Sequence, residues 1–178
     1  MKDFVAKDKT YIANMDVPLE RDMFFRTMLR TLTGTLENII GLPEAEGYMR
    51  VVGAEMGDAI GKAYLEGLGQ DRLRPDQLAA VLTDLKARIG GDFEVVAVHP
   101  DRIVFSNSRC PFGAMVDGRK SLCQMTSNVF GRIAADTHGY ARIEQLATIA
   151  EGHGHCHVVV HLRHDPDGEG TSYFRTGE

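Results

Sequence analysis

Residues 109–135 read RCPFGAMVDGRKSLCQMTSNVFGRIAA and contain two of the three cysteines of the chain. Cys110 opens this stretch, Cys123 follows after 12 further residues, and Cys156 comes after the Gly/His-rich turn GHGH. Each cysteine stands where a loop meets a predicted helix or strand, and functional side chains are often held at such junctions. We therefore expect the three thiols to converge on one site.

The composition is that of an ordinary globular domain. A chain of 178 residues that is 43% hydrophobic is long enough to bury a core as one domain. A net charge of −5 leaves no basic excess to neutralise phosphates, which argues against direct binding to nucleic acid. No apolar run is long enough for a membrane span, and the N-terminal MKDFVAKDKTYIANMD lacks the apolar centre of a signal peptide. We expect a cytoplasmic protein with reduced thiols and no membrane partner.

Three helices are predicted in the N-terminal half. Residues 1–15 show no periodicity and are interpreted as a flexible arm. Apolar residues at steps of three and four then predict an amphipathic helix from about Asp16 to residue 40. A second helix is predicted over residues 44–68 and a third over residues 75–89, each bounded by proline or glycine.

The second helix carries a stripe of glycines. Gly53, Gly57 and Gly61 recur at a spacing of four residues and therefore share one face. Because each glycine costs about 1 kcal/mol of helix stability against alanine, the stripe indicates a compensating gain. That gain is either the close approach of another helix or room for a ligand.

The C-terminal half predicts two β-hairpins separated by a helix. Runs rich in β-branched and aromatic residues mark the strands, and apolar steps of three and four mark the helix. The predicted strands are 93–98, 102–106, 140–146 and 156–163, and the predicted helix is 121–137. We expect one α+β domain over residues 16–164, in which the N-terminal helices pack on a small antiparallel sheet, followed by a loose tail over residues 165–178.

The cysteines allow several chemistries. Three thiolates can hold zinc with a fourth ligand from His153 or His155, or they can hold an iron–sulfur cluster. The spacing is not that of a standard zinc finger, because close cysteine pairs are missing. Cys123 lies in the first turn of its predicted helix, where the partial positive charge of the N-terminus favours a thiolate. The alternative is that all three cysteines are small buried hydrophobic side chains.

Other polar residues near the cysteines are assigned by position. In a strand that begins at Cys156, His157 and His161 lie on the face opposite to the thiol, so we expect them on a solvated face. Four basic residues surround the cysteine stretch and either lower thiol pKa values, bind an anion or are ordinary surface charges. They are Arg109, Arg119, Lys120 and Arg132.

The motifs RCPFG, SLCQMTSNVFGRIAA, GYARI, TIAEG and HCHVVVHL resemble the methanogen output domain, a sensory domain of prokaryotic regulators that is similar to the 4-vinyl-reductase domain. The resemblance covers roughly residues 23–163. It implies a fold of the haem-nitric-oxide-binding and TRAPP-like kind, which binds small hydrophobic molecules or metals and often dimerises through helices. By position, Cys110, Cys123 and Cys156 match the family cysteines. We see no helix-turn-helix, receiver or kinase segment, which indicates a stand-alone sensor or an adaptor.

We therefore expect a homodimeric sensory or ligand-binding domain that signals to a regulatory protein partner. Its redox-responsive centre would be zinc or an iron–sulfur cluster at Cys110, Cys123 and Cys156, with His153 or His155 as a further metal ligand. One alternative is a cysteine-dependent hydrolase or small reductase. Another is a pocket for a small hydrophobic or tetrapyrrole-like ligand between the glycine stripe and the sheet.

Overall fold

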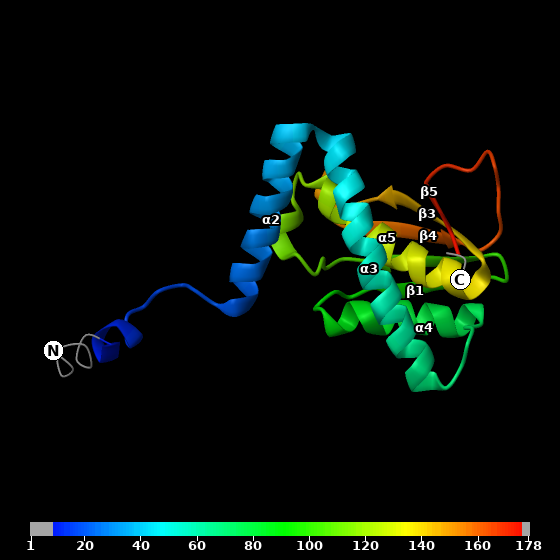
Figure 1. Ribbon diagram of the computed structural model, residues 1–178, viewed down its shortest axis with the longest axis horizontal. Helices are drawn as coiled ribbons and strands as arrows, with labels where there is room; N and C mark the ends of the chain where they lie inside the picture. Colours follow the sequence, from blue (N-terminus) through cyan, green and yellow to red (C-terminus); the bar gives the residue numbers. More distant parts are fainter. Residues whose placement is uncertain (1–8, 176–178) are drawn as a thin grey trace.

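The computed structural model describes residues 9–175, so the first part of the predicted arm and the last three residues of the predicted tail lie outside it. Residues 9–13 form a short helix, and residues 14–20 connect it to the rest of the chain (Figure 1). The longer helices are α2 (Arg21–Ile40), α3 (Leu42–Leu68), α4 (Pro75–Arg88) and α5 (Lys120–His138). Two 3₁₀ helices, η1 (Gly113–Val116) and η2 (Ile149–Glu151), flank α5 and β3 in the chain.

Five strands form one antiparallel sheet, which confirms the predicted α+β class. They are β1 (Glu94–Val98), β2 (Arg102–Asn107), β3 (Tyr140–Ala147), β4 (Cys156–His161) and β5 (Thr171–Phe174). The order across the sheet is β1-β2-β4-β3-β5, and every neighbouring pair is antiparallel. The two predicted hairpins are β1–β2 and β3–β4, and they join along β2 and β4, where Asn107 stands opposite Cys156.

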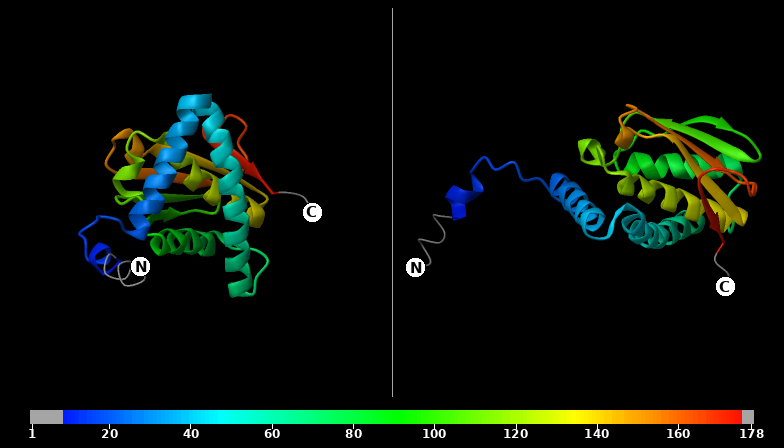
Figure 2. Two further views of the ribbon diagram at one scale, coloured as in Figure 1. Left: turned by 60° about the vertical axis from the view of Figure 1, so that its left-hand side comes forward. Right: turned by 90° about the horizontal axis from the view of Figure 1, so that it is seen from above.

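The helices form two layers on one face of the sheet (Figure 2). Helices α4 and α5 pack directly on the strands, α3 packs on α5, and α2 lies further out beside α3. The core between the sheet and α4/α5 contains Phe93, Phe105 and Phe130, whose ring centroids are 5.4–6.4 Å apart. Phe105 and Phe130 are fully buried, so this aromatic cluster is the centre of the domain.

Helix α2 begins later than expected, at Arg21 instead of near Asp16. Pro18 disfavours helical backbone at the residue before it, and Glu20 at the helix start is extended, with φ −110° and ψ 150°. At its other end α2 is joined to α3 by Gly41 alone. Gly41 has a φ of 87°, a value that glycine adopts more readily than other residues.

The glycine stripe of α3 packs against α5. A Cβ atom at Gly57 would stand 2.7 Å from Cβ of Arg132 and 3.3 Å from the main-chain oxygen of Val129, and one at Gly53 would overlap Asn128. Close helix packing therefore explains these two glycines. A ligand pocket between the stripe and the sheet was the alternative expectation, and it is wrong because α5 occupies that space.

Part of the predicted tail belongs to the sheet. Residues 171–174 form β5 and pair with β3, with Ala141 opposite Tyr173. The Tyr173 ring packs against Gly131 of α5, where a Cβ would overlap it, and the Tyr173 hydroxyl donates a hydrogen bond to Oδ1 of Asn128 at 2.7 Å. Residues 171–174 are thus an edge strand and not a loose tail.

Among residues 9–175, no helix combines the length and the apolar character that crossing a membrane requires.

Candidate functional site

The three cysteines line one small cavity at the edge of the core. Cys110 lies between β2 and η1, Cys123 lies in the first turn of α5, and Cys156 is the first residue of β4. The cavity has a volume of about 20 Å³, which is room for one water-sized molecule. Three segments that are distant in the sequence therefore bring their thiols to one place.

The wall of the cavity is largely apolar. Its polar side chains are few and include Asn107, Thr126 and Gln145. The remaining wall consists of Phe93, Pro111, Phe112, Val116, Leu122, Ile149, Ala150 and Val158. A cavity with this lining favours an apolar occupant, because burying an unpaired polar group here costs free energy.

Burial keeps the thiols protonated. It raises the pKa of Cys110 and of Cys156 above the ordinary value, and it raises the pKa of Cys123 to about 12. The expected thiolate at Cys123 is therefore wrong, because desolvation outweighs the partial charge of the helix N-terminus. The main-chain N–H of Ile149 donates to Sγ of Cys156 at 3.5 Å. This hydrogen bond lowers the pKa of Cys156, but by less than burial raises it.

A buried lysine accompanies the thiols. Lys86 of α4 is 4% exposed, and its Nζ donates a hydrogen bond to Oγ1 of Thr126 at 2.7 Å. The same ammonium lies 5.3 Å from the ring centroids of Phe93 and of Phe130. Desolvation lowers the pKa of Lys86 from 10.5 to about 8, and the cysteines oppose this shift only when they are ionised.

The burial of Lys86 is visible in the sequence pattern of α4. Lys86 follows Leu82 by four residues and Leu78 by eight, so it falls on the buried face of α4. A lysine on an apolar helix face is a marked exception to the pattern, because lysine is rarely buried without a partner.

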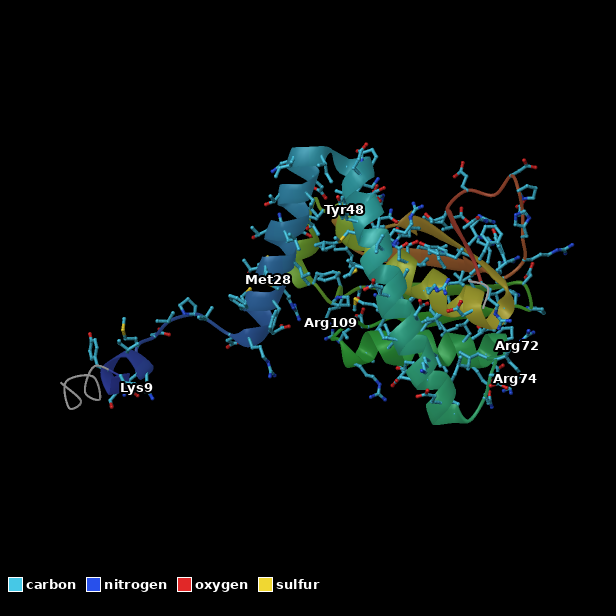
Figure 3. The ribbon with its side chains drawn as sticks, in the orientation of Figure 1. Lys9, Met28, Tyr48, Arg72, Arg74 and Arg109 are labelled. Carbon is cyan, nitrogen blue, oxygen red and sulfur yellow. The ribbon has the colours of Figure 1, made fainter. Side chains whose placement is uncertain are left out.

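The four predicted basic residues do not line the cavity. Arg119 forms an ion pair with Glu37 at 2.6 Å, and Lys120 forms one with Glu151 at 2.5 Å. Arg132 pairs with two carboxylates of α3 and α5. Arg109, labelled in Figure 3, places its main-chain N–H 2.7 Å from a carboxylate oxygen of Asp92. These residues stabilise the surroundings of the site.

The predicted histidine ligands lie in the turn before β4. The Nδ1 atom of His153 is 3.3 Å from the main-chain oxygen of Thr148, and Nδ1 of His155 is 3.0 Å from that of His153. Neither histidine lines the cavity. Within residues 9–175, no three His, Cys, Asp or Glu side chains are grouped so that they could hold a metal ion. The residues as placed do not fit the expected zinc or iron–sulfur centre.

The two strand histidines lie on the opposite face of the sheet from Cys156, as expected. His161 stands opposite Arg142 of β3, and its Nε2 is 2.8 Å from a carboxylate oxygen of Glu144. This face is not simply solvated, because Val159 and Arg142 on it are buried. Arg142 donates a hydrogen bond to the main-chain oxygen of Glu169, so the segment before β5 covers this part of the sheet.

A second hollow adjoins the thiol cavity. It has a volume of about 260 Å³ and a mainly polar lining that includes Lys120, Glu151 and Thr171. Cys123 and Gln145 line both spaces, and Nε2 of Gln145 donates to the main-chain oxygen of Cys123 at 3.3 Å. These two residues form a thin wall between the larger hollow and the enclosed cavity.

Residues 110–121, which include part of the cavity wall, are hydrogen-bonded to α2. Nη1 of Arg30 donates to the main-chain oxygens of Met115 and Asp117, at 2.5 and 3.0 Å. Further along α2, Glu37 accepts from Arg119 and from the hydroxyl of Ser121. A displacement of the segment between Cys110 and Ser121 therefore acts directly on α2.

The antiparallel sheet with helices on one face defines an α+β domain, and three thiols line a small cavity in it. The chain belongs to the methanogen output domain 1 family, whose profile matches residues 28–161. No curated protein gives a significant sequence match.

Several solved structures share the fold, among them a sensory domain and a trafficking complex subunit. One is the phenol-responsive sensory domain of the transcription activator PoxR with phenol, at 16% identity and a TM-score of 0.62, covering 82% of this chain and 75% of that one. The other is trafficking protein particle complex subunit 3 from Naegleria fowleri, covalently bound to palmitic acid, at 13% identity and a TM-score of 0.57, covering 87% of this chain and 98% of that one. At these identities the likeness is one of fold.

Proposed function

We propose that this protein is a cytoplasmic sensory domain that binds a small, mainly apolar molecule in the thiol cavity and signals to a partner protein. The observation that carries the proposal is that one segment of the chain both lines the cavity and contacts α2. Residues of the segment from Cys110 to Ser121 line the cavity on one side and hold α2 on the other through Arg30 and Glu37. Two proteins of the same fold hold apolar ligands, phenol and palmitic acid.

Binding would couple to α2 by opening the cavity. A space of about 20 Å³ admits one water-sized molecule, so a larger ligand must displace part of the wall. The wall at Cys123 and Gln145 separates the cavity from the larger hollow, so displacing these two side chains would join the two spaces. A ligand that binds the open form better than the closed form shifts the population toward it, and with it the position of α2.

The test of this proposal is a titration with phenol and small alkyl-substituted phenols, followed by amide chemical shifts in two-dimensional NMR. We expect shift changes at the residues that line the cavity, in segments 93–126 and 145–158, and at the residues of α2 near Arg30 and Glu37 that contact the segment 115–121. Ala150→Val should weaken binding at least about tenfold, because two added carbons fill the space that the ligand needs. Ala80→Val, on the exposed side of α4, is the matched control and should leave binding unchanged. Shift changes that persist in Ala150→Val would overturn the cavity as the binding site.

A metal or iron–sulfur centre is the second candidate, and the convergence of Cys110, Cys123 and Cys156 on one cavity favours it. It requires the thiols to regroup, since their present placement forms no metal site within the described chain. Metal analysis and an absorption spectrum of anaerobically purified protein test it. One bound metal per chain that is lost in Cys123→Ser would support it. Colourless, metal-free protein whose melting temperature ignores chelators would exclude it.

We further propose that the sensory unit is a homodimer formed through α2 and α3. Several large apolar side chains of these helices are about half exposed, and such surfaces commonly mark interfaces. They include Phe24, Phe25, Met28, Leu32, Tyr48 and Val51, of which Met28 and Tyr48 are labelled in Figure 3. The helix-mediated dimerisation implied by the family resemblance supports the same arrangement.

Phe25→Glu tests the homodimer. Because a buried, unpaired charge opposes association, we expect this variant to sediment as a monomer at concentrations where the wild type is a dimer. Leu146→Glu is the control, since Leu146 is 56% exposed and belongs to β3 and not to either helix, and this change should not alter the mass. A wild-type chain that is monomeric at high micromolar concentration would contradict the proposal.

A further inference from the structure

Lys86 is a buried amine without a carboxylate partner. Within residues 9–175 it forms no ion pair, and its one hydrogen bond goes to Thr126. An ammonium has three donors, so the hydrogen-bonding capacity of Lys86 is only partly used. Thr126 and Phe93, both in contact with this ammonium, line the thiol cavity. Lys86 thus stands directly behind the part of the cavity wall that Thr126 and Phe93 form.

Such surroundings make an amine reactive. Removal from water disfavours the ammonium form, and a neutral lysine amine adds to carbonyl carbons, as in Schiff-base lysines. The lowered pKa of Lys86, about 8, means that an appreciable share of the amine is neutral near pH 7. The thiols beside it keep their protons, because burial raises their pKa values.

We propose that Lys86 and one of the cavity thiols form a covalent capture site for small aldehydes of one or two carbons. This inference rests on the proposed ligand cavity and names its ligand class. The closed cavity, about 20 Å³, leaves room only for the smallest carbonyl compounds, whereas phenols require it to open, and its apolar wall disfavours charged compounds. The three thiols line the cavity, and the Lys86 amine contacts Thr126 and Phe93 of the same wall, so both nucleophiles that such a compound can join border one space.

The reaction needs no oxidant or reductant. The lone pair of the neutral Lys86 amine attacks the carbonyl carbon, and proton transfer to the oxygen gives a carbinolamine. Loss of one water leaves an imine, in which carbon is doubly bonded to Nζ. The S–H of a neighbouring cysteine then adds across this bond, so that sulfur bonds to carbon and the thiol proton moves to nitrogen. The sum is aldehyde plus amine plus thiol giving an N,S-acetal and one water.

The experiment exposes the full-length protein to formaldehyde, and separately to acetaldehyde, at an equimolar concentration near pH 7. Mass spectrometry of the intact chain and of its peptides follows the product. We expect a gain equal to the aldehyde minus one water, located on a cross-link between Lys86 and a peptide that contains Cys110, Cys123 or Cys156. Lys86 should react roughly tenfold faster or more than an exposed lysine, because more of its amine is neutral.

Variants separate the parts of the inference. Lys86→Met should abolish the cross-link, whereas Lys62→Met, at a lysine that is 76% exposed, should leave it intact. Each cysteine is replaced by serine in turn, and only one of the three replacements should abolish the cross-link. A mass gain that survives Lys86→Met overturns the capture site, and a gain that no cysteine variant affects overturns the role of the thiols. If phenols still bind in an Ala150-dependent manner while Lys86 stays unmodified, the aldehyde inference fails and the proposed sensory function stands.

Discussion

Lys86→Met is expected to stabilise the protein near pH 7 and to lose most of this advantage by pH 10. In the wild type, burial lowers the pKa of Lys86 from 10.5 to about 8, so the folded state is penalised wherever the ammonium persists. Between about pH 8 and pH 10.5, the folded and unfolded pKa values of Lys86, the unfolded chain binds more protons than the folded one, so the stability of the wild type rises with pH. Methionine has a similar shape and no charge. The difference in unfolding free energy between variant and wild type should fall by about 2 kcal/mol over this range.

The thiols contribute with the opposite sign. Their pKa values are raised by burial, so above pH 9 the folded state holds protons that the unfolded state has lost, and stability falls. Burial is the main cause of these raised pKa values in both proteins, and the Lys86 charge lowers the pKa of Cys110 and Cys156 to a smaller extent, so the comparison removes most of the thiol contribution. Denaturant titrations at pH 7, 8, 9 and 10 supply the measurement, with Lys62→Met as the exposed control. Parallel stability curves for Lys86→Met and wild type would mean that Lys86 is not buried as described.

Gly57→Leu is expected to cost about 3 kcal/mol of stability or to prevent folding. A Cβ at this position would meet Cβ of Arg132 at 2.7 Å and a main-chain oxygen of α5 at 3.3 Å, so α3 and α5 must separate. Overpacking of this kind costs about 1–3 kcal/mol, and more where backbone is the obstacle. The separation would also disturb the ion pairs that Arg132 forms.

The same helix offers a matched control. A Cβ atom at Gly67 would meet no other part of the molecule within 4 Å, so the side chain of Gly67→Leu enters open space. Since leucine favours helix over glycine by nearly 1 kcal/mol, this variant should be neutral or slightly stabilising. Thermal and urea unfolding of both variants and of the wild type measure these differences in stability. Equal stability of Gly57→Leu and Gly67→Leu would contradict the close packing of α3 on α5.

The regular elements were predictable because their patterns are local. The apolar steps of α4 and α5 and the alternation around Cys156 follow from backbone geometry alone. Strand β5 was not predictable in this way. It lies in a Gly-rich polar tail and is held by Tyr173, whose ring fits against Gly131 and whose hydroxyl reaches Asn128. Those contacts join residues far apart in the sequence.

At the site, too, the features set by local sequence were predictable and those set by distant contacts were not. The junctional positions of the cysteines indicated that they would meet, and the structure places all three on one cavity. Cys110 and Cys123 are buried among Phe112, Leu122 and Ile149, which come from three different segments, and this burial raises their pKa values. The local effect of the helix N-terminus on Cys123 was visible in the sequence, but the larger effect of desolvation was not. Lys86 lay on an apolar helix face, and only the sheet and α5 make that face a closed interior.

The single-residue joint at Gly41 gives α2 the properties of a lever. Arg30 lies ten residues from Ile40, the last residue of α2, which is roughly 15 Å along a helix, and Arg21 lies roughly 30 Å away. If α2 pivots as a rigid rod at Gly41, a movement applied at Arg30 by the segment over the cavity doubles at Arg21. A shift of a few tenths of an ångström at the thiols would thus be amplified toward Phe24 and Phe25, where α2 exposes its apolar side chains.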